Sequence, residues 1–314
     1  ELMPGPDFPT GGIIANKKDL PAIYETGVGK IKLRGKIEVE LGRRKADRDK
    51  LVISEIPYTM IGAGINKFLV DIAELVENKT LSDVVDISNQ SSKEGIRIVL
   101  ELKKDADIEK IRNILYKKTK LEDTFGVNML AIAHGRPETL NLRGILQNYL
   151  EFQYENTTHK YQALLEKELE KKEIREGLIR ACDVIDLIIA ILRGSKNLKD
   201  AKACLMNGDI SKIQFKHPGF EEDAKQLNFT EKQANAILEM RLYKLIGLEI
   251  LALQKEYKEC LKRIAEYEKV LKSRDGMNKV IKEDLDHIKE EFAEPRKTLI
   301  ENGKEAVYEE SAAA

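Results

Sequence analysis

The chain has 314 residues and a formal net charge of −1, and 34% of its residues are charged. This length allows two or three domains that each bury a core. The near-neutral balance excludes a global field that would attract DNA or an anionic membrane, so any electrostatic function must be local.

The cysteines and the hydropathy pattern indicate the cellular compartment in which the chain is expected. Cys182, Cys204 and Cys260 lie far apart, which argues against a disulfide framework and against a zinc knuckle. We find no apolar run long enough to cross a membrane and no signal peptide. A cytoplasmic protein without a membrane partner is therefore expected.

The first part of the chain reads as a lead-in followed by one basic strand. Residues 1–29 are rich in proline and glycine, which predicts an extended, irregular segment. Strict alternation from residue 30 to 41 predicts a single strand whose apolar face carries Ile31, Leu33, Ile37 and Val39. The opposite face of this strand then carries the cations Lys30, Lys32, Arg34 and Lys36.

Charge is segregated around this strand. Residues 30–50 hold nine Lys or Arg against four Asp or Glu, a local excess of +5 in a chain of net charge −1. A solvated strand face is the simple explanation for the row of cations, and contact with phosphate groups is the alternative. For the turn-like cluster Arg43, Arg44, Lys45 and Arg48 we favour solvation, because Asp47 and Asp49 partly neutralise it.

The remaining pattern up to residue 139 predicts a mixed α/β domain. Strands are expected at 50–58, 81–90, 95–103 and 125–135, and helices at 65–78 and 106–119. The segment "IGAGI" at 61–65 lacks the residues of a nucleotide-binding loop, and His134 has no catalytic partner in sequence. We expect both to be structural, and no catalytic or metal site is predicted.

From residue 140 the pattern is almost entirely helical. One coiled-coil seam is predicted at Leu142, Ile145, Tyr149, Phe152, Asn156, His159 and Ala163. A second is predicted at Leu242, Ile246, Glu249, Leu253, Tyr257, Cys260, Ile264, Tyr267 and Leu271. The two helices are expected to form antiparallel arms at 140–175 and 242–294, with a globular knob at 176–241 and a tail at 295–314.

The knob carries more apolar side chains than it needs to cover itself. The runs "DVIDLIIAIL" and "AILEMRL" are apolar on two sides, which predicts burial against a second chain. The residues expected at this dimer interface are Ile185, Ile188, Ile189, Ile237 and Met240. The whole chain is therefore expected to be α+β, with an α/β domain followed by a coiled coil and an all-helical dimerisation knob.

Several long motifs in order resemble one protein family. "GPDFPTGG", "YETGVGKIKLRGK", "ISEIPY", "FGVNMLAIAHGRPETLNLRGIL" and "TEKQANAILEMRLYKLIGLE" are similar to the A subunit of bacterial type IIA DNA topoisomerase, either DNA gyrase or topoisomerase IV. The segment "TMIGAGINK" at 59–67 departs from the family pattern, and the choice between the two types stays open.

The resemblance implies a role for each part of the chain. Residues 1–139 would be the tower domain that grips double-stranded DNA, and the knob would be the exit gate, or C-gate, where two A subunits dimerise. The B subunit would be a further partner through which the parent complex uses ATP and Mg²⁺, so no cofactor is expected in this chain. The sequence contains no Arg-Tyr pair of the kind that carries the family's catalytic tyrosine, so we expect no cleavage by this chain alone.

A second hypothesis is a structural protein of another class. An antiparallel coiled-coil dimeriser without a DNA role would account for residues 140–272. It would not account for the basic strand or for the ordered motifs. Salt-sensitive binding of duplex DNA separates the two hypotheses.

Overall fold

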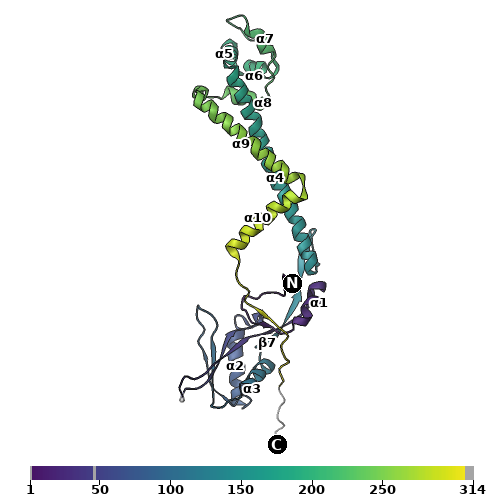
Figure 1. The fold of residues 1–314 in the computed structure, drawn as a ribbon, viewed down its shortest axis with the longest axis vertical. Helices are drawn as coiled ribbons and strands as arrows, with labels where there is room; N and C mark the ends of the chain where they lie inside the picture. Colours follow the sequence, from purple (N-terminus) through teal and green to yellow (C-terminus); the bar gives the residue numbers. More distant parts are fainter. Residues whose placement is uncertain (1, 45–46, 308–314) are drawn as a thin grey trace. The chain divides into compact units, whose positions relative to one another are not determined.

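The computed structural model describes residues 2–44 and 47–307 and divides into two compact units. We call residues 1–150 with 293–314 the sheet unit, and residues 151–292 the helical unit. Helices make up 54% of the chain and strands 17%, which confirms the α+β class. Figure 1 shows the elements in chain order.

The first sheet of the sheet unit joins the two ends of the described chain. Its strand order is β10 (Leu299–Ile300), β1 (Ile13–Ile14), β2 (Val28–Arg34) and β7 (Glu122–Asn128), with β10 parallel to β1. The expected irregular lead-in is therefore partly ordered. It contains β1, the 3-10 turn η1 (Lys17–Asp19) and α1 (Leu20–Thr26), which ends at Gly27 in the left-handed region, with φ 79°. The apolar side chains of this layer form one core, comprising Phe8, Ile14, Leu20, Ile23, Ile31 and Leu33.

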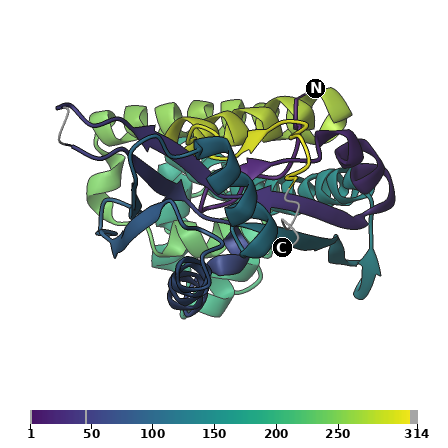
Figure 2. The same ribbon diagram turned by 90° about the horizontal axis from the view of Figure 1, so that it is seen from below.

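The second sheet carries the larger core of the sheet unit. Its order is β3 (Lys36–Glu40), β4 (Lys50–Glu55), β6 (Ile98–Leu102) and β5 (Val84–Asn89), all antiparallel. The helices α2 (Gly64–Glu77) and α3 (Ile108–Lys118) pack on one face of it (Figure 2). The short turn η2 (Tyr58–Met60) leads from β4 toward α2. Strands 50–58, 81–90 and 95–103 and both helices were predicted from periodicity and are confirmed.

The prediction of one strand from residue 30 to 41 is wrong. The run divides into β2 and β3, which belong to different sheets, and buried Gly35 lies between them. A Cβ at Gly35 would lie 2.7 Å from the backbone oxygen of Glu55 and would also meet Leu121. The backbone N–H of Gly35 donates to the oxygen of Leu121 at 2.8 Å, so the chain leaves one ladder for the other at this glycine.

The predicted last strand of this unit also divides. Residues 122–139 form β7 and then a hairpin of β8 (Leu130–Ala133) and β9 (Arg136–Thr139). His134 sits at the hairpin turn with φ 52°. The side-chain oxygen of Asn141 accepts a hydrogen bond from the N–H of Gly144 at 2.7 Å and therefore caps the next helix.

The helical unit contains an antiparallel helix pair. α4 (Leu142–Asp183) and α9 (Gly247–Lys272) meet at Tyr161 and Tyr267, whose ring centroids lie 5.6 Å apart, edge to face. They meet again where the thiol of Cys260 donates to the backbone oxygen of Glu168 at 3.1 Å. After extended Ser273 the chain continues in α10 (Arg274–Phe292), which also contacts α4, where the guanidinium of Arg274 lies 3.5 Å from the ring centroid of Tyr154.

One predicted seam is confirmed in part and the other is wrong. On α9, Cys260 and Ile264 are buried as predicted, but Leu242 and Ile246 are exposed because η3 (Leu242–Leu245) replaces the first turn of helix. On α4 the contacting side holds Thr157, Tyr161 and Glu168 instead of the predicted positions. The predicted seam residues that are exposed are Tyr149, Phe152, Asn156, His159 and Ala163.

Four short helices form the knob around the end of α4. These are α5 (Ile185–Gly194), α6 (Leu198–Asn207), α7 (Phe220–Lys225) and α8 (Glu231–Leu238). Thr230 and Gln233 cap α8 reciprocally in a capping box. Thirteen buried side chains from these helices, from the loops between them and from α4 make one core.

Candidate functional site

Two of the four predicted cations lie on an exposed face of the first sheet and have almost no ion pairing among the described residues. Lys30 and Lys32 on β2 point away from Ile31 and Leu33, which are 0% and 1% exposed. Lys30 has no ion pair within the described residues, and Lys32 has only a contact of 3.9 Å with Glu305. Opposite Lys30 on β7 lies Gly126, where no atom would meet an added Cβ, so the face is open there.

Buried Asn16 fixes the backbone that carries both lysines. Its side-chain oxygen accepts from the N–H of Lys32 at 2.8 Å, and its Nδ2 donates to the backbone oxygen of Lys30 at 3.0 Å. The same Nδ2 donates to Asp19 at 2.9 Å. The Asn16 side chain therefore pairs with the backbone of β2 beyond the point where β1 ends. It fixes the backbone that carries Lys30 and Lys32.

Lys17 and Lys18 extend this surface, and the sequence prediction missed them. Both follow Asn16 directly and both are exposed. Their N–H groups bond to the backbone oxygen of Glu301 at 3.1 Å and to the side chain of Asn302 at 2.9 Å. The Lys-Lys pair in "ANKKD" was the available signal. We call Lys17, Lys18, Lys30 and Lys32 the basic face.

Arg34 does not belong to the basic face. Its side chain is 11% exposed, and its Nε forms an ion pair with Glu122 on β7. Its Nη2 donates to the backbone oxygen of Lys304 at 2.7 Å, and its guanidinium lies 5.0 Å from the ring centroid of Tyr116. Arg34 thus links β2 to β7 and α3 inside the sheet unit, so few N–H groups of its guanidinium remain to bind a ligand.

Lys36 lies beyond Gly35, on the second sheet. Its Nζ is 2.9 Å from Glu38, and the hydrogen bond to Glu38 is the main cause that raises the pKa of Lys36. The predicted row of four cations on one strand is therefore corrected: β2 carries Lys30, Lys32 and Arg34, of which only the two lysines are exposed, and Lys36 lies on β3. In the predicted cluster at residues 43–48, Arg48 lies 4.0 Å from Glu101, and Lys45 lies outside the described residues.

The predicted dimer residues divide between core and surface. Ile188 and Ile237 are 1% and 3% exposed, and they lie in the knob's own core, where they present no surface to a second chain. This corrects their assignment to the interface. Ile185, Ile189 and Met240 are half-buried and remain partly accessible.

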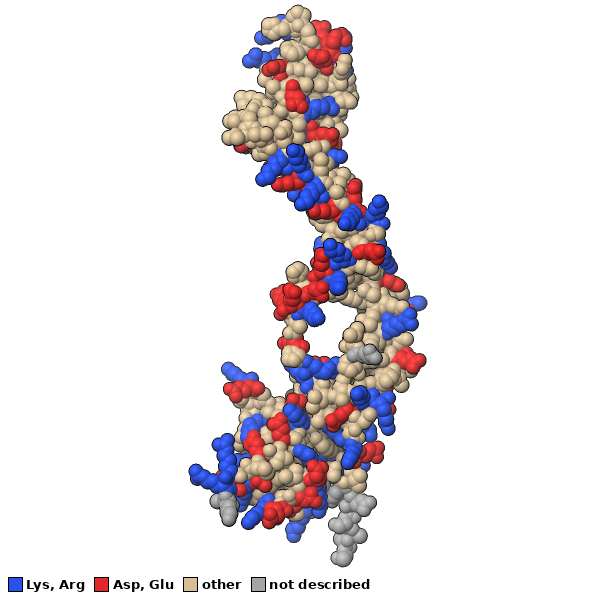
Figure 3. All heavy atoms as spheres, viewed as in Figure 1, with Lys and Arg blue, Asp and Glu red and all other residues tan. Residues whose placement is uncertain are grey.

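A stronger apolar surface lies just beyond the predicted knob. Four side chains within ten residues of sequence are more than half exposed: Leu242 (82%), Ile246 (57%), Leu248 (78%) and Leu251 (61%). We call them the apolar patch. Figure 3 shows an uncharged bulge over this start of α9. Their helical spacing misled the sequence prediction, which placed Leu242 and Ile246 inside the coiled coil.

Among the described residues, no group of three His, Cys, Asp or Glu is arranged to hold a metal ion. No helix in the described part of the chain is long and apolar enough to span a bilayer.

Comparison with known proteins places the chain among topoisomerase subunits. Residues 1–286 match the family model that describes the A subunit of DNA gyrase/topoisomerase IV. The DNA gyrase A subunit of Clostridium acetobutylicum is 40% identical over 300 residues, which is 96% of this chain and 33% of the relative. The DNA topoisomerase 4 A subunit of Staphylococcus epidermidis is 37% identical over 301 residues, which is 96% of this chain and 35% of the relative.

A third relative has a similar identity and a similar share of each chain covered. The DNA gyrase A subunit of Aminobacterium colombiense is 39% identical over 307 residues, covering 97% of this chain and 34% of the relative. The chain thus spans about a third of the length of the curated relatives it matches. Because the family model covers most of the chain, the chain belongs to the family of DNA gyrase and topoisomerase IV A subunits.

Proposed function

We propose that this chain is a DNA-binding and dimerising scaffold of a type IIA topoisomerase. The sheet unit acts as the tower that grips the cleaved duplex, the helix pair α4 and α9 acts as an arm, and the knob with the apolar patch forms the exit gate. The observation that carries the DNA role is the basic face, a set of exposed lysines on β2 and on the adjoining turn η1 within a nearly neutral chain.

The basic face suits phosphate groups better than bases. A strand backed by a core, with Ile31 and Leu33 buried beneath it, presents charge at fixed spacing and no helix that would enter a groove. Lysine acts as a point charge toward phosphate. Binding should therefore be independent of sequence and should weaken strongly with salt.

The first test measures duplex affinity of the 314-residue chain by fluorescence anisotropy at several salt concentrations. Lys30→Ala/Lys32→Ala should weaken binding and reduce the log–log salt slope by about 2, because each lost phosphate contact removes about 0.9 from it. Both side chains are exposed, so the fold should be unaffected. Lys258→Ala/Lys262→Ala on α9 removes the same charge from two other exposed positions and serves as the control.

The opposite result would favour the second hypothesis. Equal affinity and equal salt slope in the wild type and in Lys30→Ala/Lys32→Ala would remove the tower assignment, and would leave a coiled-coil dimeriser without a DNA role. Loss of binding in the α9 control alone would move the DNA contact to the helical unit.

We assign the remaining steps of the reaction to other parts of the assembly. Double-strand passage requires a catalytic tyrosine, and we predict no relaxation or cleavage of supercoiled plasmid by this chain alone. We further propose that a B subunit supplies ATP hydrolysis and Mg²⁺, that two copies of this chain dimerise, and that the complex works in the cytoplasm. Plasmid relaxation by the isolated chain would contradict this division.

A further inference from the structure

The exposed face of the first sheet continues past the basic face as an apolar surface. Three large side chains there are about half exposed or more: Val28 (48%), Leu130 (60%) and Ile132 (79%). We call them the apolar strip. Val28 stands two residues before Lys30 on β2 and points to the same side of the sheet, away from buried Ile31.

The hairpin of β8 and β9 extends this face at its end. Val28 pairs with Asn128 on β7, and Leu130 pairs with Thr139 on β9. The hydroxyl of Thr139 donates to the side-chain oxygen of Asn128 at 3.2 Å. Because residues paired across neighbouring strands point to the same side, Leu130 lies on the side that carries Val28 and the lysines.

Within the described strands, no carboxylate interrupts this face from the lysines to the hairpin. Its outward positions, all exposed, are alternate residues from Val28 to Lys32 on β2 and from Thr124 to Ile132 on β7 and β8, with Pro137 and Thr139 on β9. Aspartate and glutamate make up 54 of the 314 residues of the chain. The face is therefore positive at one end and uncharged at the other, which suits a polyanion.

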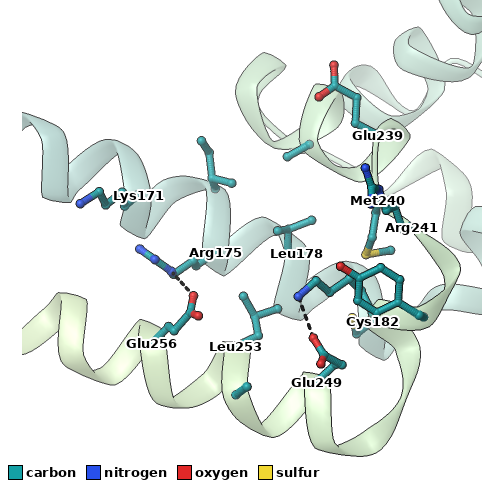
Figure 4. A pocket seen from close by; sticks show the side chains of 15 residues that line it. Lys171, Arg175, Leu178, Cys182, Glu239, Met240, Arg241, Glu249, Leu253 and Glu256 are labelled. Atoms are coloured by element: carbon teal, nitrogen blue, oxygen red, sulfur yellow. Dashed lines mark hydrogen bonds and ion pairs between the residues drawn. The ribbon is translucent and has the colours of Figure 1, made fainter.

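Apolar surface in the helical unit is surrounded by charges of both signs. A cavity of about 490 Å³ lies there between α4, α8, η3 and α9 (Figure 4). At its wall Arg175 is bonded to Glu256 at 3.2 Å, and Lys244 is bonded to Glu249 at 2.7 Å. Such paired charges resemble the polar rim of a protein interface, and the glutamates would repel DNA. The outward face of the first sheet differs on both counts.

A duplex that lies on the lysines and follows β2 toward the hairpin covers the apolar strip. Gly126 pairs with Lys30, and Ile132 stands six residues further along the chain, so it lies at most about 22 Å away. One helical turn of DNA is longer, at about 34 Å. Apolar side chains gain nothing from phosphate groups. The apolar surface of a duplex is its base stack, which leucine and isoleucine side chains reach from the minor groove.

We propose that the apolar strip enters the minor groove of the duplex held by the basic face, and that Leu130 and Ile132 wedge one base step open. This inference rests on the proposed DNA role and extends it from phosphate contacts to the base stack. Pairing of β8 with β9 supports the wedge, and Ala133, which is 4% exposed, anchors the hairpin on its other side. The bound duplex is therefore kinked at this step.

The test compares two duplexes of about 30 base pairs, close to three helical turns. One is fully paired, and the other carries a two-nucleotide bulge at its centre. The bulge is already unstacked, so opening a step there costs less. In fluorescence anisotropy the 314-residue chain should bind the bulged duplex about tenfold more tightly than the paired one.

Variants separate the wedge from the phosphate contacts. Leu130→Thr/Ile132→Thr removes the apolar ends but keeps residues that favour strands, and it should bind both duplexes equally. The matched control Leu41→Thr/Val70→Thr changes two other exposed apolar residues of the sheet unit, at 71% and 56% exposure, and should keep the preference. Lys30→Ala/Lys32→Ala should weaken binding of both duplexes by the same factor and also keep the preference.

Two results would overturn the wedge while leaving the DNA role of the basic face in place. The first is equal affinity of the wild type for the two duplexes, with binding still weakened by Lys30→Ala/Lys32→Ala. The second is a preference that persists in Leu130→Thr/Ile132→Thr, which would leave the apolar strip to a protein partner. If the double variant does not fold, Ile132→Thr alone repeats the comparison. Failure of the wild type to bind either duplex would refute the DNA role and the wedge together.

Discussion

Glu168 is a carboxylate buried in the contact between α4 and α9. Its side chain is 8% exposed, and it pairs with Lys171 at 2.8 Å and with Arg263 at 3.1 Å. Burial alone would raise its pKa, but the interactions with Lys171, Cys260 and Arg263 outweigh burial and lower the pKa to about 2. The helix pair thus contains one ionised group whose partners come from both helices.

We predict that the helical unit loses stability in acid through this residue. Because the pKa of Glu168 is lower in the folded chain, about 2 against 4.5, the unfolded state binds more protons between these pH values. The stabilisation is complete above about pH 4.5 and is lost as the pH falls toward 2, with about 3 kcal/mol as the upper limit. Urea unfolding of the 314-residue chain at a series of pH values measures it.

The variant Glu168→Gln should be less stable at pH 7 and should lose most of this acid dependence. Its former partners Lys171 and Arg263 are 52% and 37% exposed, so they remain solvated. Glu166→Gln removes an exposed carboxylate from the same helix and should change the free energy of unfolding by no more than about 0.5 kcal/mol. An unchanged acid dependence in Glu168→Gln would contradict the assignment.

At the scale of residues, the sequence predicted the direction of side chains better than it predicted their ion pairs. Alternation placed Lys30 and Lys32 opposite buried Ile31 and Leu33, and the structure agrees. The same alternation counted Arg34 as a free cation, because its partner Glu122 stands 88 residues further along the chain. A partner brought in by sheet topology leaves no trace in the local pattern.

Gly177 marks the point at which α8 packs on α4. A Cβ at Gly177 would lie 2.7 Å from Cβ and 2.8 Å from Cδ of Gln233. Gln233 cannot move aside freely, since its side chain bonds to the N–H of Thr230 at 3.0 Å and to the backbone oxygen of Glu173 at 2.8 Å. The glycine is thus required by close approach of two elements.

We predict that Gly177→Ala destabilises the chain although alanine is the better helix former. Helix propensity favours alanine by about 1 kcal/mol, whereas the clash with fixed Gln233 should cost about 1–3 kcal/mol and displace α8. The matched control is Gly247→Ala at the start of α9, where no atom would meet the new Cβ, and this variant should be neutral or stabilised. Thermal unfolding that shows both variants equally stabilised would refute the packing argument.

At the scale of elements, periodicity succeeded where the contact is apolar. The positions of Cys260 and Ile264 on α9 follow the predicted seam. The contacting side of α4 includes the buried polar residues Thr157 and Glu168, so a search for apolar repeats selected Tyr149 and Phe152, which are 43% and 55% exposed. Likewise, the division of residues 30–41 at Gly35 depends on Leu121 and Glu55, which are remote in sequence.

At the scale of the whole chain, the order of motifs predicted the family and the structure refined its surfaces. Fold class and family are confirmed. The dimer residues were only partly placed, because an apolar side chain in a small domain can face its own core or a partner, and sequence does not separate the two. Burial separates them here: Ile188 and Ile237 face inward, while the apolar patch faces solvent.

The apolar patch should hold two copies of the chain together. Exposed clusters of large apolar side chains are typical of interaction surfaces, and a twofold dimer uses each residue twice. Because burying one leucine contributes about 1.5–3 kcal/mol, Leu242→Ser/Leu248→Ser should weaken dimerisation by far more than tenfold. Sedimentation equilibrium at micromolar concentration should show a wild-type dimer and a monomeric variant. Leu198→Ser, at a 69% exposed leucine of α6, should remain dimeric. A monomeric wild type, or a variant that dimerises as the wild type does, would exclude this surface as the gate.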